Sequence, residues 1–286
     1  MHEMKPKVKG GQYSGYTYEP FDVIYSIISY SDYQVNEALL TNVMTAAINT
    51  LESSSQTVSA KISAIKVIQL LFFKNRAAEI WEEIKQQIID RKEMYTSGFE
   101  MSFFHKDTIS VLNFSYDLLT SCFDPQKTTQ VIEDVFCLNQ KDSLSIIRCL
   151  NILSMHFESG VGSLFNERIL EAFLHFSVLM TQHRERDIKY HATKCLVGLT
   201  SFDNTRDLAL VQLSQIMNSG SQNAKIAILV RAGQLDSKDD SFVDQILKKG
   251  KADSNYLVRY VADRESKAHP LKTKTVLHKE TVGATS

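Results

Sequence analysis

Two stretches of the chain, DIKYHATKCLVGL at residues 187–199 and NAKIAILVRAGQL at residues 223–235, repeat one apolar pattern 36 positions apart. In the first stretch the apolar residues follow the spacing i, i+4, i+8 and i+11 of one helix face, and they are Ile188, Ala192, Leu196 and Leu199. The corresponding residues of the second stretch are Ala224, Ile228, Ala232 and Leu235. A fixed period of this length is typical of stacked helical units, none of which can bury its apolar face alone. We therefore expect these faces to be buried between neighbouring units.

Similar periodic segments fill most of the chain, and turns rich in Gly, Ser, Asn and Asp separate them. No segment shows the sustained alternation of a β-strand, so the sequence predicts an all-α protein. The predicted helices are residues 20–30, 34–52, 57–74, 76–93, 106–122, 126–138, 142–158, 163–181, 186–200, 205–218, 222–235, 239–249 and 253–265.

Short connections make consecutive helices antiparallel neighbours. The predicted pairs are 57–93, 106–138, 142–181, 186–218 and 222–249, followed by a half-unit at 253–265. We therefore expect one α-solenoid domain over residues 20–265. An irregular lead-in containing Tyr and Gly precedes it at 1–19, and a flexible basic tail follows at 266–286.

The composition agrees with a helical, soluble chain. Apolar residues make up 43% of the sequence and charged residues 23%, and the 4 Pro and 11 Gly are too few for the turns of an all-β protein. The four Cys are far apart and form no CxxC pair, so we expect reduced thiols. The start of the chain lacks the apolar stretch of a signal peptide, and no apolar run is long enough to span a membrane. We expect a cytoplasmic protein without a membrane partner.

The repeated units resemble those of the HEAT-repeat family, within the armadillo and HEAT-like α-solenoids. The residues that carry the resemblance are Asp187, Lys189 and Ala192, then Asn223 and Lys225, then Val258, Arg259 and Ala262, with earlier copies at Ala60, Lys61, Ala64, Ile68 and Leu71 and at Ile147 and Arg148. The resemblance implies a right-handed α–α superhelix of stacked antiparallel helix pairs. It also implies that the acidic residue and the Lys or Arg two positions later bond along the stack. Leu257 departs from this pattern, because it occupies the acidic position of the last unit.

Three residues with metal-ligating side chains, His183, Asp187 and His191, have the spacing i, i+4, i+8. In an unbroken helix they would share one side. The stretch TQHRERD is more typical of a connection before a helix that Asp187 caps, and Arg184 and Arg186 would repel a cation. We therefore expect no metal site.

His191 and Cys195 are one helical turn apart, a spacing in which a base can activate a thiol. Cys195 also lies beside the apolar face of its helix, where a small buried cysteine is the commoner role. The chain contains no GxSxG, HExxH, P-loop or GxGxxG motif. We expect no catalytic residue, no cofactor and no enzymatic activity.

The aromatic residues raise a separate question about surfaces. Trp81, the only tryptophan, is adjacent to Ile80 and Ile84 and is expected in the core, although an exposed Trp81 would be an anchor for a partner. The tyrosines concentrate near the start of the chain, where they suit a cap of the stack or a docking surface. They are Tyr13, Tyr16, Tyr18, Tyr25, Tyr30 and Tyr33.

In an α-solenoid the second helix of each pair lines the inner wall. Here those helices carry polar residues of both signs, which suits a protein or peptide partner better than a phosphate backbone. We therefore expect a non-enzymatic interaction scaffold or sensor that binds a protein or peptide on its concave surface. The residues expected to contact the partner are Glu167, Glu171, Gln212 and Gln215.

Two alternatives stay open. The first is a nucleic-acid-binding protein, or a glycosylase for alkylated DNA bases like the HEAT-like members of that class. Its contacts would come from a basic patch formed by Lys248, Lys249, Lys251, Arg259 and Arg264. Residues 245–280 carry a net charge of +5 and residues 1–10 carry +2, but the remainder carries −8, which disfavours a bound backbone. The second alternative is a regulatory subunit or domain of a larger complex, which would leave the same sequence pattern as a scaffold.

Overall fold

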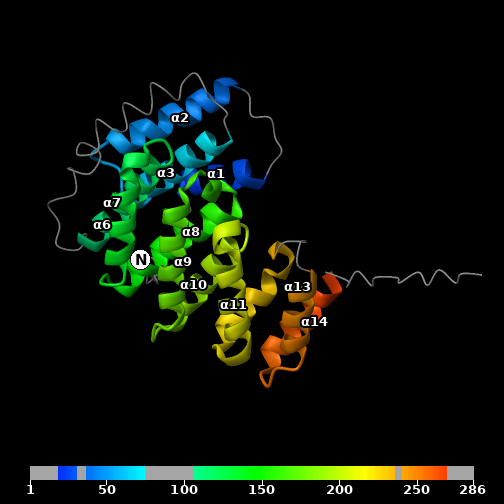
Figure 1. Ribbon diagram of the computed structural model, residues 1–286. Helices are drawn as coiled ribbons and strands as arrows, with labels where there is room; N and C mark the ends of the chain where they lie inside the picture. The colour runs from blue at the N-terminus through cyan, green and yellow to red at the C-terminus, as the bar shows by residue number, and fades with distance from the viewer. Residues whose placement is uncertain (1–18, 31–36, 75–105, 236–239, 269–286) are drawn as a thin grey trace, which may run out of the picture.

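The computed structural model of the chain describes residues 19–30, 37–74, 106–235 and 240–268 (Figure 1). These residues form helices and turns and contain no strand, which confirms the predicted all-α class. The α-helices are α1 (Pro20–Tyr30), α2 (Glu37–Glu52), α3 (Val58–Phe73), α6 (Lys106–Ser121), α7 (Thr128–Leu138), α8 (Ser143–Glu158), α9 (Glu167–Thr181), α10 (Arg186–Leu199), α11 (Asp203–Ser219), α12 (Gln222–Val230), α13 (Asp240–Lys251) and α14 (Tyr256–Ala268). Short 3₁₀ helices lie at η2 (Pro125–Lys127), η3 (Val161–Leu164) and η4 (Ala232–Gln234).

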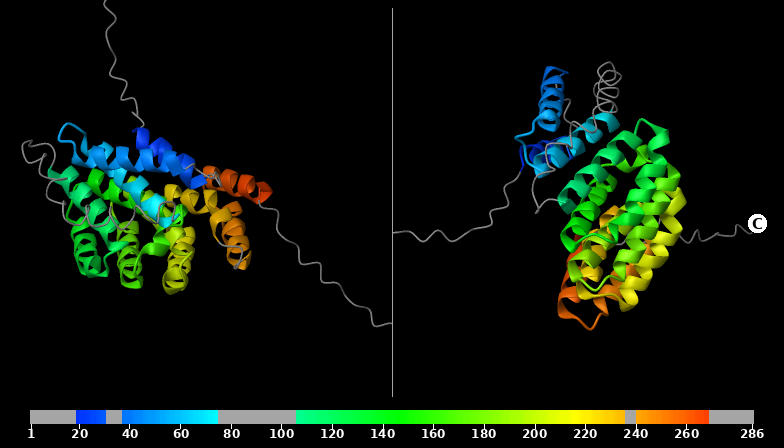
Figure 2. Two further views of the ribbon diagram at one scale, coloured as in Figure 1. Left: turned by 90° about the horizontal axis from the view of Figure 1, so that it is seen from above. Right: turned by 90° about the vertical axis from the view of Figure 1, so that its left-hand side faces the viewer.

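The helices from α3 onward pack in two rows. The first row is α3, α6, α8, α10, α12 and α14, and each of its helices contacts the next one. The second row is α7, α9, α11 and α13, which also contact one another in order and lie side by side in Figure 2 (left). The first helix of each predicted pair therefore lies in the first row, and the described second helices lie in the second row.

Helix α1 lies against the first row. It contacts α3, and the Tyr25 hydroxyl donates a hydrogen bond to the Met155 carbonyl oxygen of α8 at 3.1 Å. The same hydroxyl lies 2.7 Å from the hydroxyl oxygen of Ser159. An ion pair between Asp22 and Lys66 adds a link from α1 to α3. Tyr25 is buried, so this tyrosine of the predicted Tyr-rich start belongs to the core.

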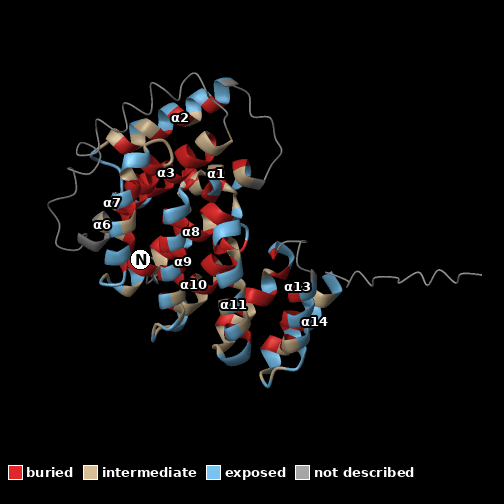
Figure 3. Ribbon diagram, viewed as in Figure 1, coloured by how far each residue is buried: buried red, intermediate tan, exposed pale blue. Residues whose placement is uncertain are grey.

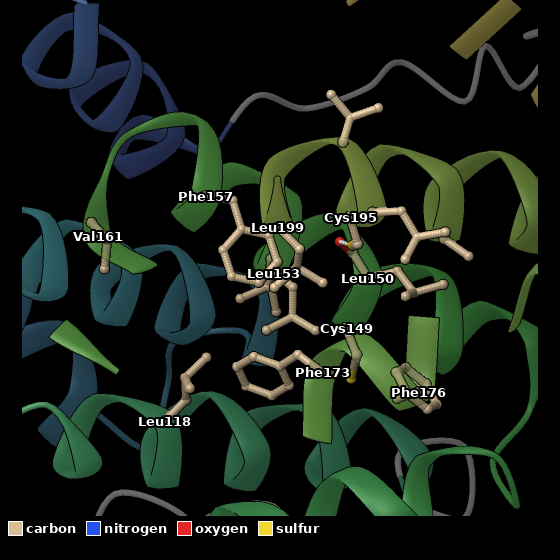
Figure 4. Close-up of a cluster of buried hydrophobic side chains, with 14 of the residues drawn as sticks. Leu118, Cys149, Leu150, Leu153, Phe157, Val161, Phe173, Phe176, Cys195 and Leu199 are labelled. Carbon is tan, nitrogen blue, oxygen red and sulfur yellow. Dashed lines mark hydrogen bonds between the residues drawn. The ribbon is translucent and has the colours of Figure 1, made fainter. Parts of the chain in front are cut away.

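The core between the rows is apolar and continuous along the stack. Figure 4 shows its centre, where Phe157 of α8, Phe173 of α9 and Leu199 of α10 converge. Phe157 and Phe173 have ring centroids 6.2 Å apart in a tilted arrangement. Along most helices buried and exposed residues alternate with the helical period, as Figure 3 shows.

The repeated faces that predict the fold are buried as expected. Ile188, Ala192 and Ile228 have no exposed surface, and Leu235 is buried as well. Helix α10 is largely enclosed, because only Arg186 and Asp187 of its residues are exposed. It contacts α8 and α12 in its own row and α9 and α11 in the other.

Side chains at the residue before each helix fix several helix starts. Asp142, Asn166 and Ser221 each accept hydrogen bonds from backbone N–H groups of the first turn that follows. Asp187 does not cap α10, contrary to the prediction. The residue before that helix is Glu185, and Asp187 lies in the first turn, where a negative charge favours the helix dipole.

Several predicted helix ends differ from those of the structure. The segment 222–235 is not one helix, because α12 ends at Val230 and the chain continues as η4, which contains Gly233, a poor helix former. The segment 163–181 begins as η3, and α9 starts only at Glu167 after its cap. Helix α14 spans Tyr256–Ala268, so it is displaced by three residues from the predicted helix 253–265. The predicted helix 76–93 with Trp81, and Tyr13, Tyr16, Tyr18 and Tyr33, lie outside the described residues.

Candidate functional site

Three successive helices of the second row carry large exposed apolar side chains. Phe136 of α7 is 61% exposed, Leu179 of α9 is 50% exposed, and Val211 of α11 is 51% exposed. Leu208 of α11 is exposed beside Val211. Single exposed apolar residues are common, but a succession along adjacent helices is typical of an interaction surface. We call Phe136, Leu179, Leu208 and Val211 the apolar track.

A polar pocket of about 160 Å³ opens where α9 and α11 end and α12 begins. Its volume is well above the roughly 10–15 Å³ that one water molecule requires. Among the described residues that line it, Lys189 of α10 supplies the only charged side chain. The other lining residues are Thr181, Gln182, Gln212, Gln215, Ile216, Ser219, Gly220, Ser221 and Ala224. We call this cavity the Lys189 pocket.

The structure separates the four predicted partner-binding residues into two pairs. Gln212 and Gln215 both line the Lys189 pocket. Glu167 and Glu171 are exposed on the first two turns of α9, at the opposite end of that helix from its pocket residue Thr181. The Asn204 side-chain amide donates to the Glu167 carbonyl oxygen at 3.2 Å, so α9 and α11 begin side by side.

Sequence reasoning did not find the other pocket residues or the apolar track. Thr181 and Gln182 end one helix, and Ser219 and Ser221 flank a turn forty residues later, so only the packing of the two rows brings them together. The sequence identifies Lys189 as a repeated residue that carries the HEAT resemblance, but not as part of a pocket. The exposed apolar residues carried no signal, because in the sequence Leu179 and Val211 resemble core residues.

One bond along the stack has the chemistry that the HEAT resemblance implies. The Lys225 ammonium of α12 lies 2.7 Å from an Asp253 carboxylate oxygen, and Asp253 lies in the turn before α14. Both side chains are largely buried. Burial raises the pKa of Asp253, but hydrogen bonds from Lys225 and from the Asn255 N–H outweigh this effect and hold that pKa below its usual value. The acid comes from the turn before α14 rather than from the position that Leu257 occupies.

Residues of the predicted basic patch are partly committed to internal bonds. Lys249 donates to the Ser214 hydroxyl of α11 at 3.2 Å, and the Arg259 guanidinium donates to the carbonyl oxygens of Asp253 and Ser254. Arg264 pairs with the adjacent Glu265. Lys248 and Lys251 are exposed at the end of α13. Three of the five residues are therefore held by bonds within the chain, and the predicted patch is not a set of five freely exposed charges.

The His183, Asp187 and His191 side chains do not share one helix. The chain turns between α9 and α10, and the His183 Nδ1 atom accepts a hydrogen bond from the Glu185 N–H in that turn. Within the described ranges no group of three His, Cys, Asp or Glu residues is placed to hold a metal ion.

Cys195 is a core thiol, as its position predicts. It has no exposed surface, and its sulfur atom donates to the Leu150 carbonyl oxygen at 3.0 Å. Burial raises the pKa of Cys195 to about 12, which keeps the thiol protonated at neutral pH. Burial also lowers the pKa of His191. The predicted alternative, a thiol activated by a base, does not fit this environment.

Comparison with protein-family models, with curated proteins and with solved structures finds no match to this chain. The helices of the described part include none that is long and apolar enough to cross a membrane.

Proposed function

We propose that this chain is a protein-interaction module built as a HEAT- or armadillo-like α-solenoid, with a right-handed superhelix of stacked helix pairs. It binds a protein or peptide partner across the second row, between the apolar track and the Lys189 pocket. The observation that carries this proposal is the exposure of Phe136, Leu179 and Val211 on adjacent helices, beside a pocket of amide and hydroxyl groups. We place its action in the cytoplasm and give it no catalytic step.

The character of the surface favours a polypeptide over a nucleic acid. Leu179 and Val211 would pack against apolar side chains, and the amides of Gln212 and Gln215 can pair with a peptide backbone. Glu167 and Glu171 are exposed on the same row and would repel a phosphate backbone laid along it. We therefore expect only weak binding of duplex DNA. A titration at two salt concentrations tests this, since tight and salt-sensitive binding would support the nucleic-acid alternative.

Partner capture with matched variants tests the proposal. The test variant carries Leu179→Asp and Val211→Asp, and the control variant carries Val230→Asp. Val230 is 43% exposed but lies on the first row, so the control introduces a similar surface carboxylate away from the proposed site.

Affinity purification from native cells, with quantitative mass spectrometry, should recover a partner with the wild type and with the control but not with the test variant. Buried contacts of this kind contribute a few kcal/mol, so the loss should be at least about tenfold. Equal recovery with all three proteins would contradict the proposal. Circular dichroism of each variant confirms that the helices remain.

A further inference from the structure

Two neighbouring seams of the first row are built on the same plan. Lys189 is the fourth residue of α10, and Lys225 is the fourth residue of α12. Each helix meets the next helix of the row, α12 in one case and α14 in the other. The two lysines are 36 positions apart, so they occupy equivalent positions in two successive units.

In the seam between α12 and α14 the lysine has an internal carboxylate. Asp253, which lies three residues before the start of α14, places its Oδ2 atom 2.7 Å from the Lys225 Nζ atom. The Asn255 side chain donates to the Gln222 side-chain oxygen at 2.9 Å in the same seam. This seam is closed by charge pairing and hydrogen bonding.

In the seam between α10 and α12 the corresponding position holds no acid. Ser219 lies three residues before the start of α12, where the next unit has Asp253. Lys189 and Ser219 line the same pocket, and no Asp or Glu is part of its lining. Among the described residues Lys189 forms no ion pair. The pocket lining therefore combines the Lys189 side chain with the side-chain amides of Gln212 and Gln215, at a place where the fold elsewhere puts a carboxylate. The hydroxyls of Thr181 and Ser219 already donate to the carbonyl oxygens of Val178 and Gln215.

We propose that the Lys189 pocket binds a carboxylate of the partner, which takes the position that Asp253 takes in the next seam. An ammonium group and the side-chain amides of Gln212 and Gln215 are the donors that a carboxylate requires. This inference rests on the proposed function, because it names the chemistry of the peptide that the second row holds. The carboxylate comes from an acidic side chain or from a chain terminus.

Small carboxylates test the pocket without knowledge of the partner. The probes are N-acetyl-glutamate N-methylamide, its glutamine counterpart, N-acetylglycine as a chain terminus, and inorganic phosphate, all at constant ionic strength. NMR spectra of the isotope-labelled full chain report the side-chain amides of Gln212 and Gln215 and the backbone amides near Ser219. The glutamate probe should shift these signals in a saturable way, and the glutamine probe should leave them unchanged. A stronger response to the glutamate probe than to N-acetylglycine identifies an acidic side chain as the source of the carboxylate. The opposite order identifies a chain terminus.

Three variants make the assignment specific. Lys189→Gln removes the ammonium group and should weaken glutamate binding about tenfold or more. Ser219→Asp supplies an internal carboxylate as in the next seam and should abolish binding. Lys248→Gln removes the same charge from the exposed end of α13 and should bind like the wild type. Circular dichroism and thermal melting check that all three variants are folded.

The inference is overturned if the glutamine probe produces the same shifts, if phosphate alone binds, or if Lys189→Gln binds glutamate like the wild type. Its failure is separable from that of the proposed function. If no carboxylate binds but the Leu179→Asp and Val211→Asp variant still loses its partner, only the carboxylate assignment falls. If the glutamate probe binds through Lys189 but partner capture does not depend on the apolar track, the proposed function falls instead.

Discussion

Arg231, directly after α12, forms an ion pair with Glu158 at the end of α8, with 3.2 Å between the Arg231 Nε atom and a Glu158 carboxylate oxygen. Helix α10 lies between these two helices in the first row. Packed helices have axes about 8–10 Å apart, so in a straight row α8 and α12 would be about 16–20 Å apart. The pair therefore depends on the reach of two long side chains, and it joins the C-terminal ends of two helices that are not direct neighbours in the row. It connects units that are two repeats apart.

Because this pair spans a whole unit, its loss should weaken the stack as a whole. The two side chains are mostly buried, and a hydrogen bond between charged groups contributes about 1.5–3 kcal/mol. We expect Arg231→Ala to lower the free energy of unfolding by an amount in this range, as measured by urea denaturation. Arg168→Ala, on the exposed side of α9, is the control and should change it by less than about 0.5 kcal/mol. Similar effects of the two substitutions would show that the pair does not stabilise the stack.

The buried seam between units gives a second prediction. Ile228 has no exposed surface, so Ile228→Asp places an unpaired carboxylate in the core and should cost several kcal/mol. That is a large share of the stability of a typical domain. Val230→Asp, two residues further along the same helix, places the carboxylate in solvent and should melt close to the wild type. If both variants melted alike, the assignment of the buried face of α12 would be wrong.

The ion pair between Lys225 and Asp253 predicts a dependence of stability on pH. Burial raises the pKa of Asp253, but hydrogen bonds from Lys225 and Asn255 lower it by a larger amount. The pKa in the folded protein therefore lies below the ordinary value of 3.8. A depressed carboxyl pKa contributes stability above the unfolded value, and this contribution is lost as the pH falls through the folded pKa.

The free energy of unfolding should therefore decrease as the pH falls below about 4. Asp253→Asn should make this part of the curve flatter, and Asp263→Asn, at an exposed position of α14, should leave its shape unchanged. Parallel curves for the wild type and Asp253→Asn would exclude a depressed pKa at this residue.

The four cysteines should differ strongly in reactivity. Cys137 is exposed, whereas Cys149 and Cys195 are buried. Burial raises the pKa of Cys195 and of Cys122 to about 12 and also raises the pKa of Cys149. Iodoacetamide at about pH 8 should therefore modify Cys137 first, and the others only after unfolding. Peptide mapping by mass spectrometry measures this order, and rapid modification of Cys195 in the folded protein would contradict the assigned core.

The sequence predicts the local parts of this fold well, for a physical reason. Helical periodicity is a property of neighbouring residues, so the spacing of Ile188 and Ala192 is sufficient to identify a buried face. The 36-residue period pairs Lys189 with Lys225 and orders the helices in rows. Errors occur at helix ends, such as the end of α12 at Val230, because end positions depend on a few residues and the periodic pattern continues through Gly233.

Relations between distant residues are not visible in the sequence. The contact of Tyr25 with Met155 and Ser159 depends on where α1 lies on the first row. The Lys189 pocket depends on how two turns approach each other, and no short motif encodes that distance. Gln212 and Gln215 line the pocket, and the sequence selects them as polar residues of a second-row helix. The same criterion selects Glu167 and Glu171, which lie at the other end of α9.

The enclosure of α10 affects the order in which the units would unfold under a mechanical force. A unit at the end of the stack has a neighbour on one side only, whereas α10 is held by helices of both rows on both sides. When a terminal unit unfolds, the contacts between α10 and its own neighbours therefore stay in place. A chain pulled by its two ends would release its terminal units one after another and would keep α10 folded longest.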